Sequence, residues 1–191
     1  VSDRPQGVLL REAGQEEKMK KILTGKIVTV GDNVDTDQIY PGRYLALTDP
    51  AEIGSHCLSG IDEGLAARFP AGGMVVGGRN FGCGSSREHA VIALQNMGAS
   101  AVLADSFARI FYRNAVNLGL VPVICRGLNQ HVQSGQTLTV DLEKGTVTVE
   151  ESGESYACEP LGDQAWKILE AGGLKPLMRA RYGKKEADNA E

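Results

Sequence analysis

Runs of apolar residues alternate with helical patterns along the middle of the chain. Residues 74–76, 101–104 and 120–125 form short runs that are almost wholly apolar, which is typical of strands buried on both faces of a parallel sheet. Helical patterns at residues 91–97 and 107–118 lie between these runs. The order predicts a βαβαβ unit with right-handed connections, in which the helices pack against a parallel sheet.

Capping residues mark the ends of the predicted helices. Gly98 and Gly119 are each expected to end one helix of the βαβαβ unit, and Asp105 with Ser106 is expected to cap the start of the second. A further helix start is predicted at residues 49–52, where Asp, Pro and Glu occupy the favoured cap, first and third positions.

Alternation of apolar and polar residues predicts strands of another kind on either side of this unit. Residues 22–30 indicate one strand or a strand pair, and residues 136–142 and 145–150 indicate an antiparallel hairpin with one exposed face. Residues 161–169 indicate a closing helix. The predicted fold class is therefore α/β, a mainly parallel sheet flanked by helices with an added β-hairpin.

The two ends of the chain lack sustained periodicity. We expect residues 1–20 to form a flexible N-terminal tail, and residues 175–191, which are basic and then polar, to form a fraying C-terminal tail. A single domain is expected over residues 21–174, because no internal repeat and no linker divides it.

Composition narrows the class of protein. With 191 residues, 42% of them hydrophobic and 23% charged, the chain is expected to be a soluble globular protein. A formal net charge of −4 argues against nucleic acid as the main partner. No apolar stretch is long enough to cross a bilayer, and the opening residues show no signal-peptide pattern. A cytoplasmic location without membrane contact is expected.

The four cysteines, at positions 57, 83, 125 and 158, form no Cys-x-x-Cys pair. We therefore expect this chain by itself to hold no zinc ion and no iron–sulfur cluster. Cys83 differs from the others because it lies in a glycine-rich turn close to a predicted helix start. It is interpreted either as a small residue that fills the turn or as a reactive thiol.

That turn, residues 77–90, carries the strongest chemical signal in the chain. Its glycines let a ligand approach the backbone, Arg87 adds a planar cation, and Ser85 and Ser86 add hydroxyl groups. Known phosphate-binding patterns fail, since Cys83 replaces the P-loop lysine and Arg87 replaces the third glycine of the dinucleotide fingerprint. Glu88 likewise excludes a Gly-x-Ser-x-Gly hydrolase elbow. The turn predicts an anion site with a proton-transfer group.

Two interpretations compete for Ser85. Together with Glu88 it makes a Ser-x-x-Glu capping box, in which the hydroxyl closes the start of the following helix. Alternatively, the hydroxyl points to a ligand bound beside Arg87. The two interpretations require different orientations of one side chain.

An acidic stretch, residues 32–37, resembles the first half of a calcium loop. The required spacing is absent, because Asp37 occupies the position of the invariant glycine. Turn formation by the Asp and Asn side chains is one interpretation, and an acidic residue that orients a catalytic partner is the other.

Three motifs together carry a resemblance to a known family. They are GDNVDTDQI at residues 31–39, NFGCGSSREHA at residues 80–90 and SFARIFYRN at residues 106–114. In this order they resemble the small subunits of aconitase-type hydro-lyases, those of 3-isopropylmalate dehydratase above all and those of homoaconitase next. The resemblance covers residues 20–174 and implies an aconitase swivel-domain fold.

The resemblance also implies a reaction and a partner. Such enzymes eliminate and re-add water on a small hydroxy-dicarboxylic acid, here in leucine biosynthesis. They use a [4Fe–4S] cluster held by a large subunit, so a chain of this kind would form a heterodimer, be active only with that partner and bind no cofactor itself.

Roles for individual residues follow from the same resemblance. Ser85 falls on the proton-abstracting base, Arg87 on the residue that binds a substrate carboxylate, and Asp37 on a residue of the shared active site. Gly84, Ser86 and Thr36 belong to the same motifs and are expected to line the substrate site.

The substrate is expected to be read by residues 44–47. Homoaconitase-type chains carry an arginine there, whereas this chain has Ala46 and Leu47, which suit an isopropyl group and leave a third carboxylate without a partner. Isopropylmalate is therefore predicted. Homoaconitate, citraconate and dimethylmalate remain alternatives, as does a carboxylate-binding module without catalytic activity.

Overall fold

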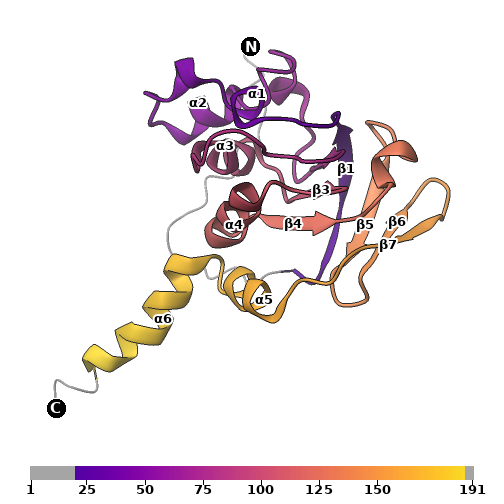
Figure 1. The fold of residues 1–191 in the computed structure, drawn as a ribbon. Helices are drawn as coiled ribbons and strands as arrows, with labels where there is room; N and C mark the ends of the chain where they lie inside the picture. The colour runs from indigo at the N-terminus through magenta and orange to yellow at the C-terminus, as the bar shows by residue number, and fades with distance from the viewer. Residues whose placement is uncertain (1–19, 188–191) are drawn as a thin grey trace, which may run out of the picture.

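The computed structural model describes residues 20–187, so residues 1–19 of the expected N-terminal tail lie outside it (Figure 1). Its frame is one seven-stranded sheet with strand order β4-β3-β2-β1-β5-β6-β7. The strands are β1 (Ile22–Thr29), β2 (Met74–Gly77), β3 (Ala101–Ala104), β4 (Val121–Ile124), β5 (Thr137–Asp141), β6 (Thr146–Val149) and β7 (Ser155–Ala157). The predicted α/β class is confirmed, and the sheet is mixed.

Strands β1 to β4 form the parallel half of the sheet. Every residue of β2 and β3 is buried, as their apolar runs predict. Alternate side chains enter different apolar layers: Val75 and Val102 pack in one, whereas Val76 and Leu103 pack in the other. Both faces of these strands are therefore covered, which explains why their sequences show no polar alternation.

Strands β5 to β7 form the antiparallel half. The two halves meet in β1, whose first five residues pair with β5 and whose last three pair with β2. The predicted hairpin is β5 and β6, and its alternating pattern of buried and half-buried residues is confirmed. Strand β7 was not predicted, because it is only three residues long and its side chains are largely exposed.

In Figure 1, α1 to α4 lie away from strands β5 to β7. The helices cover both faces of the sheet, since α2 and α3 pack into the first apolar layer and α5 packs into the second. They are α1 (Thr36–Ile39), α2 (Pro50–Ser55), α3 (His89–Met97), α4 (Arg109–Leu118), α5 (Asp163–Glu170) and α6 (Leu174–Ala187), with 3-10 turns η1 (Gly42–Tyr44), η2 (Ala66–Arg68) and η3 (Leu128–Gln130). No helix within residues 20–187 is long and apolar enough to cross a membrane.

Most predicted helix ends are confirmed. Gly98 and Gly119 end α3 and α4 in the left-handed conformation, and the Asp49 side chain accepts the Glu52 N–H at the start of α2. The cap predicted for α4 is wrong. Asp105 instead accepts the N–H of Gly127, and Ser106 accepts the N–H of Asn80, so both residues tie loops together at the end of β3.

The C-terminal segment also differs from the prediction. Residues 175–187 belong to helix α6, which packs against α4 and α5 and extends away from the sheet (Figure 1). Leu174 and Leu177 lie one turn apart and pack against the second apolar layer. The basic composition concealed this short apolar stripe, which holds the first turns of the helix to the domain.

Candidate active site

Two loops come together where neighbouring parallel strands end. The first is the connection from β1 to α1. The second is the turn at residues 78–88 between β2 and α3, which we call the catalytic turn because it carries the candidate residues Ser85 and Arg87. Backbone bonds join them: Gly82 N–H donates to Val34 O at 2.7 Å, and Thr36 N–H donates to Cys83 O at 2.8 Å. The carboxyl edge of a parallel sheet brings together segments distant in sequence, here residues 33–36 and 79–83.

Two glycines allow the catalytic turn to take this path. Gly82 has φ +78°, and a Cβ there would overlap the ring of Phe111 in α4. Gly84 has φ +103°, and a Cβ there would lie 3.1 Å from the Thr36 hydroxyl oxygen. These backbone conformations suit glycine, and the missing side chains let the turn lie against α4 and α1.

The Ser85 hydroxyl sits at the centre of a small hydrogen-bonded group. Arg87 Nε donates to Ser85 Oγ at 2.8 Å, and Thr36 Oγ1 lies 3.3 Å from the same oxygen. The backbone N–H of Ser85 donates to Thr36 Oγ1 at 3.1 Å. Because Thr36 Oγ1 already accepts that N–H, its own proton is available to donate to Ser85 Oγ. Ser85 Oγ is thus surrounded by donors suited to stabilise negative charge.

This geometry decides between the two interpretations of Ser85. Helix α3 begins at His89, its N-cap is Glu88, and no side chain caps it. The capping interpretation is therefore wrong, because the Ser85 hydroxyl is held by Arg87 and Thr36 four residues before the first helical residue. The group that would stabilise an anion at Ser85 is the guanidinium, assisted by a hydroxyl.

Arg87 also reaches the acidic stretch. Its Nη2 lies 3.4 Å from Asp37 Oδ1, and the Asp37 side chain is 65% exposed. A pair that is this long and this open to solvent is weak. A Cβ placed on Gly42 would be 3.7 Å from Arg87 Nη1, so the start of η1 also borders the guanidinium. The guanidinium is therefore both anchored at Nε and reachable on its outer nitrogens.

The other predicted site residues have different surroundings. Ser86 is exposed, and its carbonyl oxygen accepts a hydrogen bond of 3.2 Å from Asn114 Nδ2 in α4. Ala46 is exposed, and Leu47 is half-buried against the apolar layer that contains α3. The described contacts thus bring together the predicted residues Thr36, Asp37, Gly84, Ser85 and Arg87, but join neither Ala46 nor Leu47 to them.

A bracing pair that the sequence did not reveal holds the entry to the catalytic turn. Asp32 accepts the backbone N–H of Arg79 at 2.7 Å, and its other oxygen accepts Arg79 Nε at 3.0 Å and Nη2 at 2.8 Å. The Arg79 N–H and guanidinium together lower the pKa of Asp32. Spacing alone offered no signal for this pair, because its members are 47 residues apart.

Comparison with known proteins identifies the family. The model of the aconitase C-terminal domain matches residues 66–127. The 3-isopropylmalate dehydratase small subunit 1 of Methanopyrus kandleri is 47% identical over 84% of this chain and 95% of that protein. This chain belongs to the family of 3-isopropylmalate dehydratase small subunits.

Two further relatives mark the breadth of the family. The methanogen homoaconitase small subunit of Methanocaldococcus jannaschii is 45% identical over 84% of this chain and 93% of that protein. A crystal structure of 3-isopropylmalate dehydratase from the same organism has a TM-score of 0.83 and 43% identity, over 87% of this chain and 99% of that chain. The resemblance indicated by the three motifs is thereby confirmed, as is the fold.

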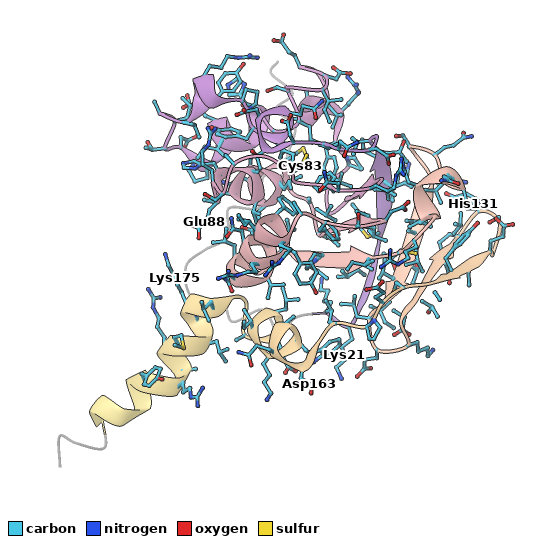
Figure 2. All side chains as sticks on the ribbon, in the orientation of Figure 1. Lys21, Cys83, Glu88, His131, Asp163 and Lys175 are labelled. Carbon is cyan, nitrogen blue, oxygen red and sulfur yellow. The ribbon has the colours of Figure 1, made fainter. Side chains whose placement is uncertain are left out.

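The four cysteines of this family member are free thiols. Cys57 is fully buried, and burial raises its pKa; burial also raises the pKa of Cys125 to about 12. Cys83 lies in the catalytic turn among the elements α1 and α3 (Figure 2), with its Sγ 3.5 Å from Asn33 O. Within residues 20–187, no group of three or more His, Cys, Asp or Glu side chains is arranged to hold a metal ion. These residues do not fit an iron–sulfur cluster.

Proposed function

We propose that this chain and a large subunit together interconvert 2-isopropylmalate and 3-isopropylmalate by removing and re-adding water. The observation that carries the proposal is the Ser85 hydroxyl held between Arg87 Nε and Thr36 Oγ1, within a motif of this hydro-lyase family. The names of the relatives with 43–47% identity support the choice of reaction.

The proton step falls to Ser85. Its ionised oxygen takes a proton from the carbon next to the one that bears the hydroxyl group. The electron pair of that C–H bond forms the double bond as the C–O bond breaks, which gives the unsaturated diacid, hydroxide and the neutral Ser85 hydroxyl. In re-addition, hydroxide adds to the carbon that lost the proton, and Ser85 gives its proton to the carbon that lost the hydroxyl group. The short bond from Arg87 Nε supports this role, because a guanidinium is cationic throughout the working pH range and favours the ionised serine.

Arg87 has a second task in this proposal. Its Nε is committed to Ser85, while its outer N–H groups are free to bind a substrate carboxylate in a two-pronged geometry. Asp37 occupies part of that position through a contact of 3.4 Å, and the exposure of its side chain makes it easy to displace. We infer that the substrate carboxylate replaces Asp37 at the guanidinium. The backbone around Gly84 and Ser86 lines the same site.

Thr36 positions the base. Its side chain is buried, it accepts the Ser85 N–H, and its proton has Ser85 Oγ as a nearby acceptor. We assign to it the orientation of Ser85 and a share in stabilising the ionised oxygen.

In this proposal the [4Fe–4S] cluster belongs to the large subunit, because no group of three or more ligand-type side chains among residues 20–187 is arranged to hold a metal ion. When bound there, such a cluster supplies a Lewis acid for the substrate hydroxyl. We also propose a reducing, cytoplasmic setting, in which scattered free thiols are stable.

Isopropylmalate is favoured over homoaconitate by the apolar residues Ala46 and Leu47. The nearby cation Arg43 lies over the Tyr44 ring at 4.7 Å, and its contact with Glu63 is long and exposed and is therefore weak. Ala46 and Leu47 themselves present apolar surface without a cation for a third carboxylate. Because a homoaconitase small subunit is among the relatives, the homoaconitase reaction is the second candidate for this chain.

The deciding experiment uses the complex reconstituted with the large subunit of the same organism. We expect turnover of 2-isopropylmalate, kcat/KM at least about 100-fold lower for homocitrate, and no turnover by either subunit alone. Citraconate and dimethylmalate are assayed beside them. Preference for homocitrate, or turnover by this chain alone, would overturn the proposal.

A further inference from the structure

Helix α4 exposes a face with two arginines, Arg109 and Arg113. In the part of the chain that the structure describes, neither guanidinium makes a hydrogen bond or an ion pair, unlike those of Arg43, Arg68, Arg79, Arg87 and Arg126. The two lie four residues apart and are neighbours on the helix surface, where like charges repel. This arrangement favours an anionic group supplied from outside.

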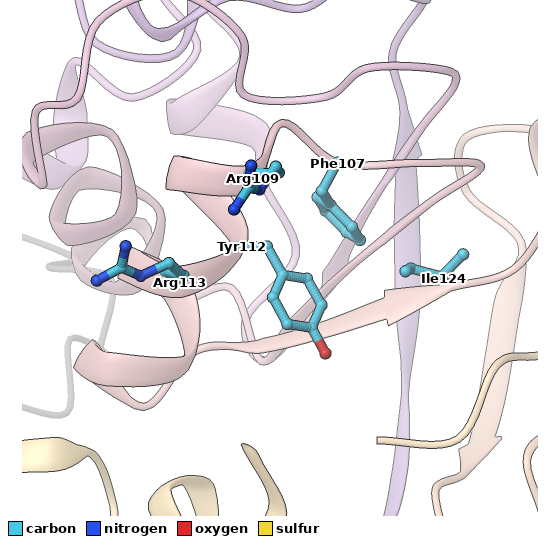
Figure 3. Close-up of a pocket in the computed structure, with 5 residues that line it drawn as sticks. All are labelled: Phe107, Arg109, Tyr112, Arg113 and Ile124. Atoms are coloured by element: carbon cyan, nitrogen blue, oxygen red, sulfur yellow. The ribbon is translucent and has the colours of Figure 1, made fainter. Parts of the chain in front are cut away.

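A hollow of about 380 Å³ lies beside these arginines. It is lined by Phe107, Arg109, Tyr112, Arg113 and Ile124, with Tyr112 and the two arginines on α4 and Ile124 at the end of β4 (Figure 3). Aromatic and aliphatic side chains thus meet two cations at one opening. Arginine and aromatic residues in partly enclosed positions are typical of the energetic centre of protein–protein interfaces.

The same face is joined to the catalytic turn. Ile110 is 48% exposed and lies one turn before Asn114, whose side chain donates to Ser86 O at 3.2 Å. On the surface of α4, Asn114 and Ile110 lie next to Ser86. The two arginines follow around the helix, and the hollow lies beyond them. We call the set Phe107, Arg109, Ile110, Tyr112, Arg113 and Ile124 the arginine face.

We infer that the arginine face is where the large subunit binds. A carboxylate side chain of the large subunit sits between the two guanidiniums, and an apolar side chain next to it fills the hollow. The inference rests on the proposed function, which requires a large subunit to complete the site at Ser85. A partner that covers the catalytic turn reaches this face by continuing across α4.

A second copy of this chain fits the face poorly. In a symmetric dimer centred here, the arginines of one copy would oppose the same arginines of the other, which is repulsive. A large subunit can supply complementary acidic residues.

The test measures binding of the full-length chain to the large subunit by calorimetry at two salt concentrations. For Arg109→Glu/Arg113→Glu we expect the Kd to rise about 100-fold or more, and for Ile110→Ala a smaller rise. Arg109→Gln/Arg113→Gln removes the charges without reversing them and is expected to give an intermediate Kd with weaker salt dependence. Lys144→Glu reverses a single positive charge in the β5–β6 turn, in the antiparallel half of the sheet, and is expected to leave the Kd unchanged.

Activity at a saturating concentration of large subunit separates binding from chemistry. The inference is supported if the arginine variants then recover wild-type kcat and KM. The inference is overturned if the Kd of the arginine variants for the large subunit is unchanged, or if these variants disrupt only self-association of this chain. It is also overturned if their KM stays raised at saturating large subunit, because the arginines would then be a substrate site. A complex that forms but leaves isopropylmalate unchanged would refute the proposed function, while the Kd comparison would still test the binding face.

Discussion

The parallel and antiparallel halves of the sheet differ in the kind of connection that leaves each strand. After β1 and β2 the chain enters loops that carry Thr36, Asp37, Ser85 and Arg87, and after β3 it enters the loop that leads to the arginine face. In the antiparallel half, tight turns connect β5 to β6 and β6 to β7. No residue of β5, β6 or β7 contributes to the hydrogen-bonded group around Ser85.

The physical cause of this difference is the direction of the strands. Parallel neighbours need long crossover connections, so their carboxyl ends lie at one edge and the loops there meet residues distant in sequence. A hairpin turn is determined by the register of its own two strands and satisfies its backbone locally. The antiparallel half contributes apolar side chains to the second layer, such as Leu138, Val140 and Val147. The parallel half carries the candidate site, and both halves contribute side chains to the apolar core.

The largest difference between the halves is expected for two serine substitutions. Ser85→Ala removes the proposed base and should lower kcat of the complex by about 10²- to 10⁴-fold, with an unchanged circular dichroism spectrum. Ser155→Ala removes an exposed hydroxyl of β7 that bonds to Thr148 in β6, far from Ser85 in the fold, and activity should stay at the wild-type level. If Ser85→Ala kept full activity, the assignment of the base would be wrong.

A pair of glycines compares the backbone of the two halves. Gly82 and Gly153 have φ of +78° and +73°, but a Cβ at Gly82 would overlap Phe111 whereas one at Gly153 meets open space. Gly153→Ala should reduce the free energy of unfolding by about 1 kcal/mol, and Gly82→Ala by about 3 kcal/mol, because overpacking adds to the backbone strain. Urea denaturation measures both. Equal losses of unfolding free energy would show that α4 shifts enough to accommodate the added methyl group.

Thr36 tests whether a buried hydroxyl matters beyond packing. Thr36→Val keeps the shape and removes the bond to Ser85, so kcat of the complex should fall about 10- to 30-fold with KM nearly unchanged. The rate should also need a higher pH to reach its half-maximum, because the ionised serine loses a donor. Thr36→Ser should restore most of the activity. Thr148→Val, which removes a hairpin hydroxyl, is the matched control. A loss that Thr36→Ser does not restore would indicate packing alone.

The smallest effects are expected for two aspartates whose pKa is lowered in the fold. Asp32 is stabilised in its charged form by the Arg79 N–H and guanidinium, and Asp141 by the Lys144 N–H. A lowered pKa stabilises the fold above the unfolded value of about 3.9, and this contribution is lost as the pH falls through the folded pKa. Asp32→Asn and Asp141→Asn should therefore each lower the Tm at pH 7, with the difference from wild type closing in acid.

Only Asp32→Asn should also raise KM, since only Asp32 braces the catalytic turn. The measurement is thermal unfolding from neutral to acidic pH, together with steady-state kinetics of the complex. A difference in Tm that persisted well below about pH 3.9 would contradict the role given to the charge.

The local sequence pattern predicted the fold where the buried positions of the structure follow the apolar positions of the sequence. The apolar runs predict β2 and β3, alternation predicts β5 and β6, and glycines predict the ends of α3 and α4. The local pattern was ambiguous or wrong where a side chain bonds to a partner that is distant in sequence. Ser85 and Asp105 both look like helix caps in sequence, yet Ser85 bonds to Thr36, 49 residues away, and Asp105 bonds to Gly127, 22 residues away.

By itself, the sequence determined the family, the βαβαβ unit with its hairpin, and the motifs that carry Thr36, Asp37, Ser85 and Arg87, because motifs and periodicity are local. Only the tertiary structure decided which way Ser85 points, which donors meet its oxygen, and that two arginines of α4 lack acidic partners in the described part of the chain. The physical reason is that a hydroxyl or a guanidinium can satisfy its hydrogen bonds in several ways. The crossover connections between parallel strands determine which distant residues come close enough to bond to each group.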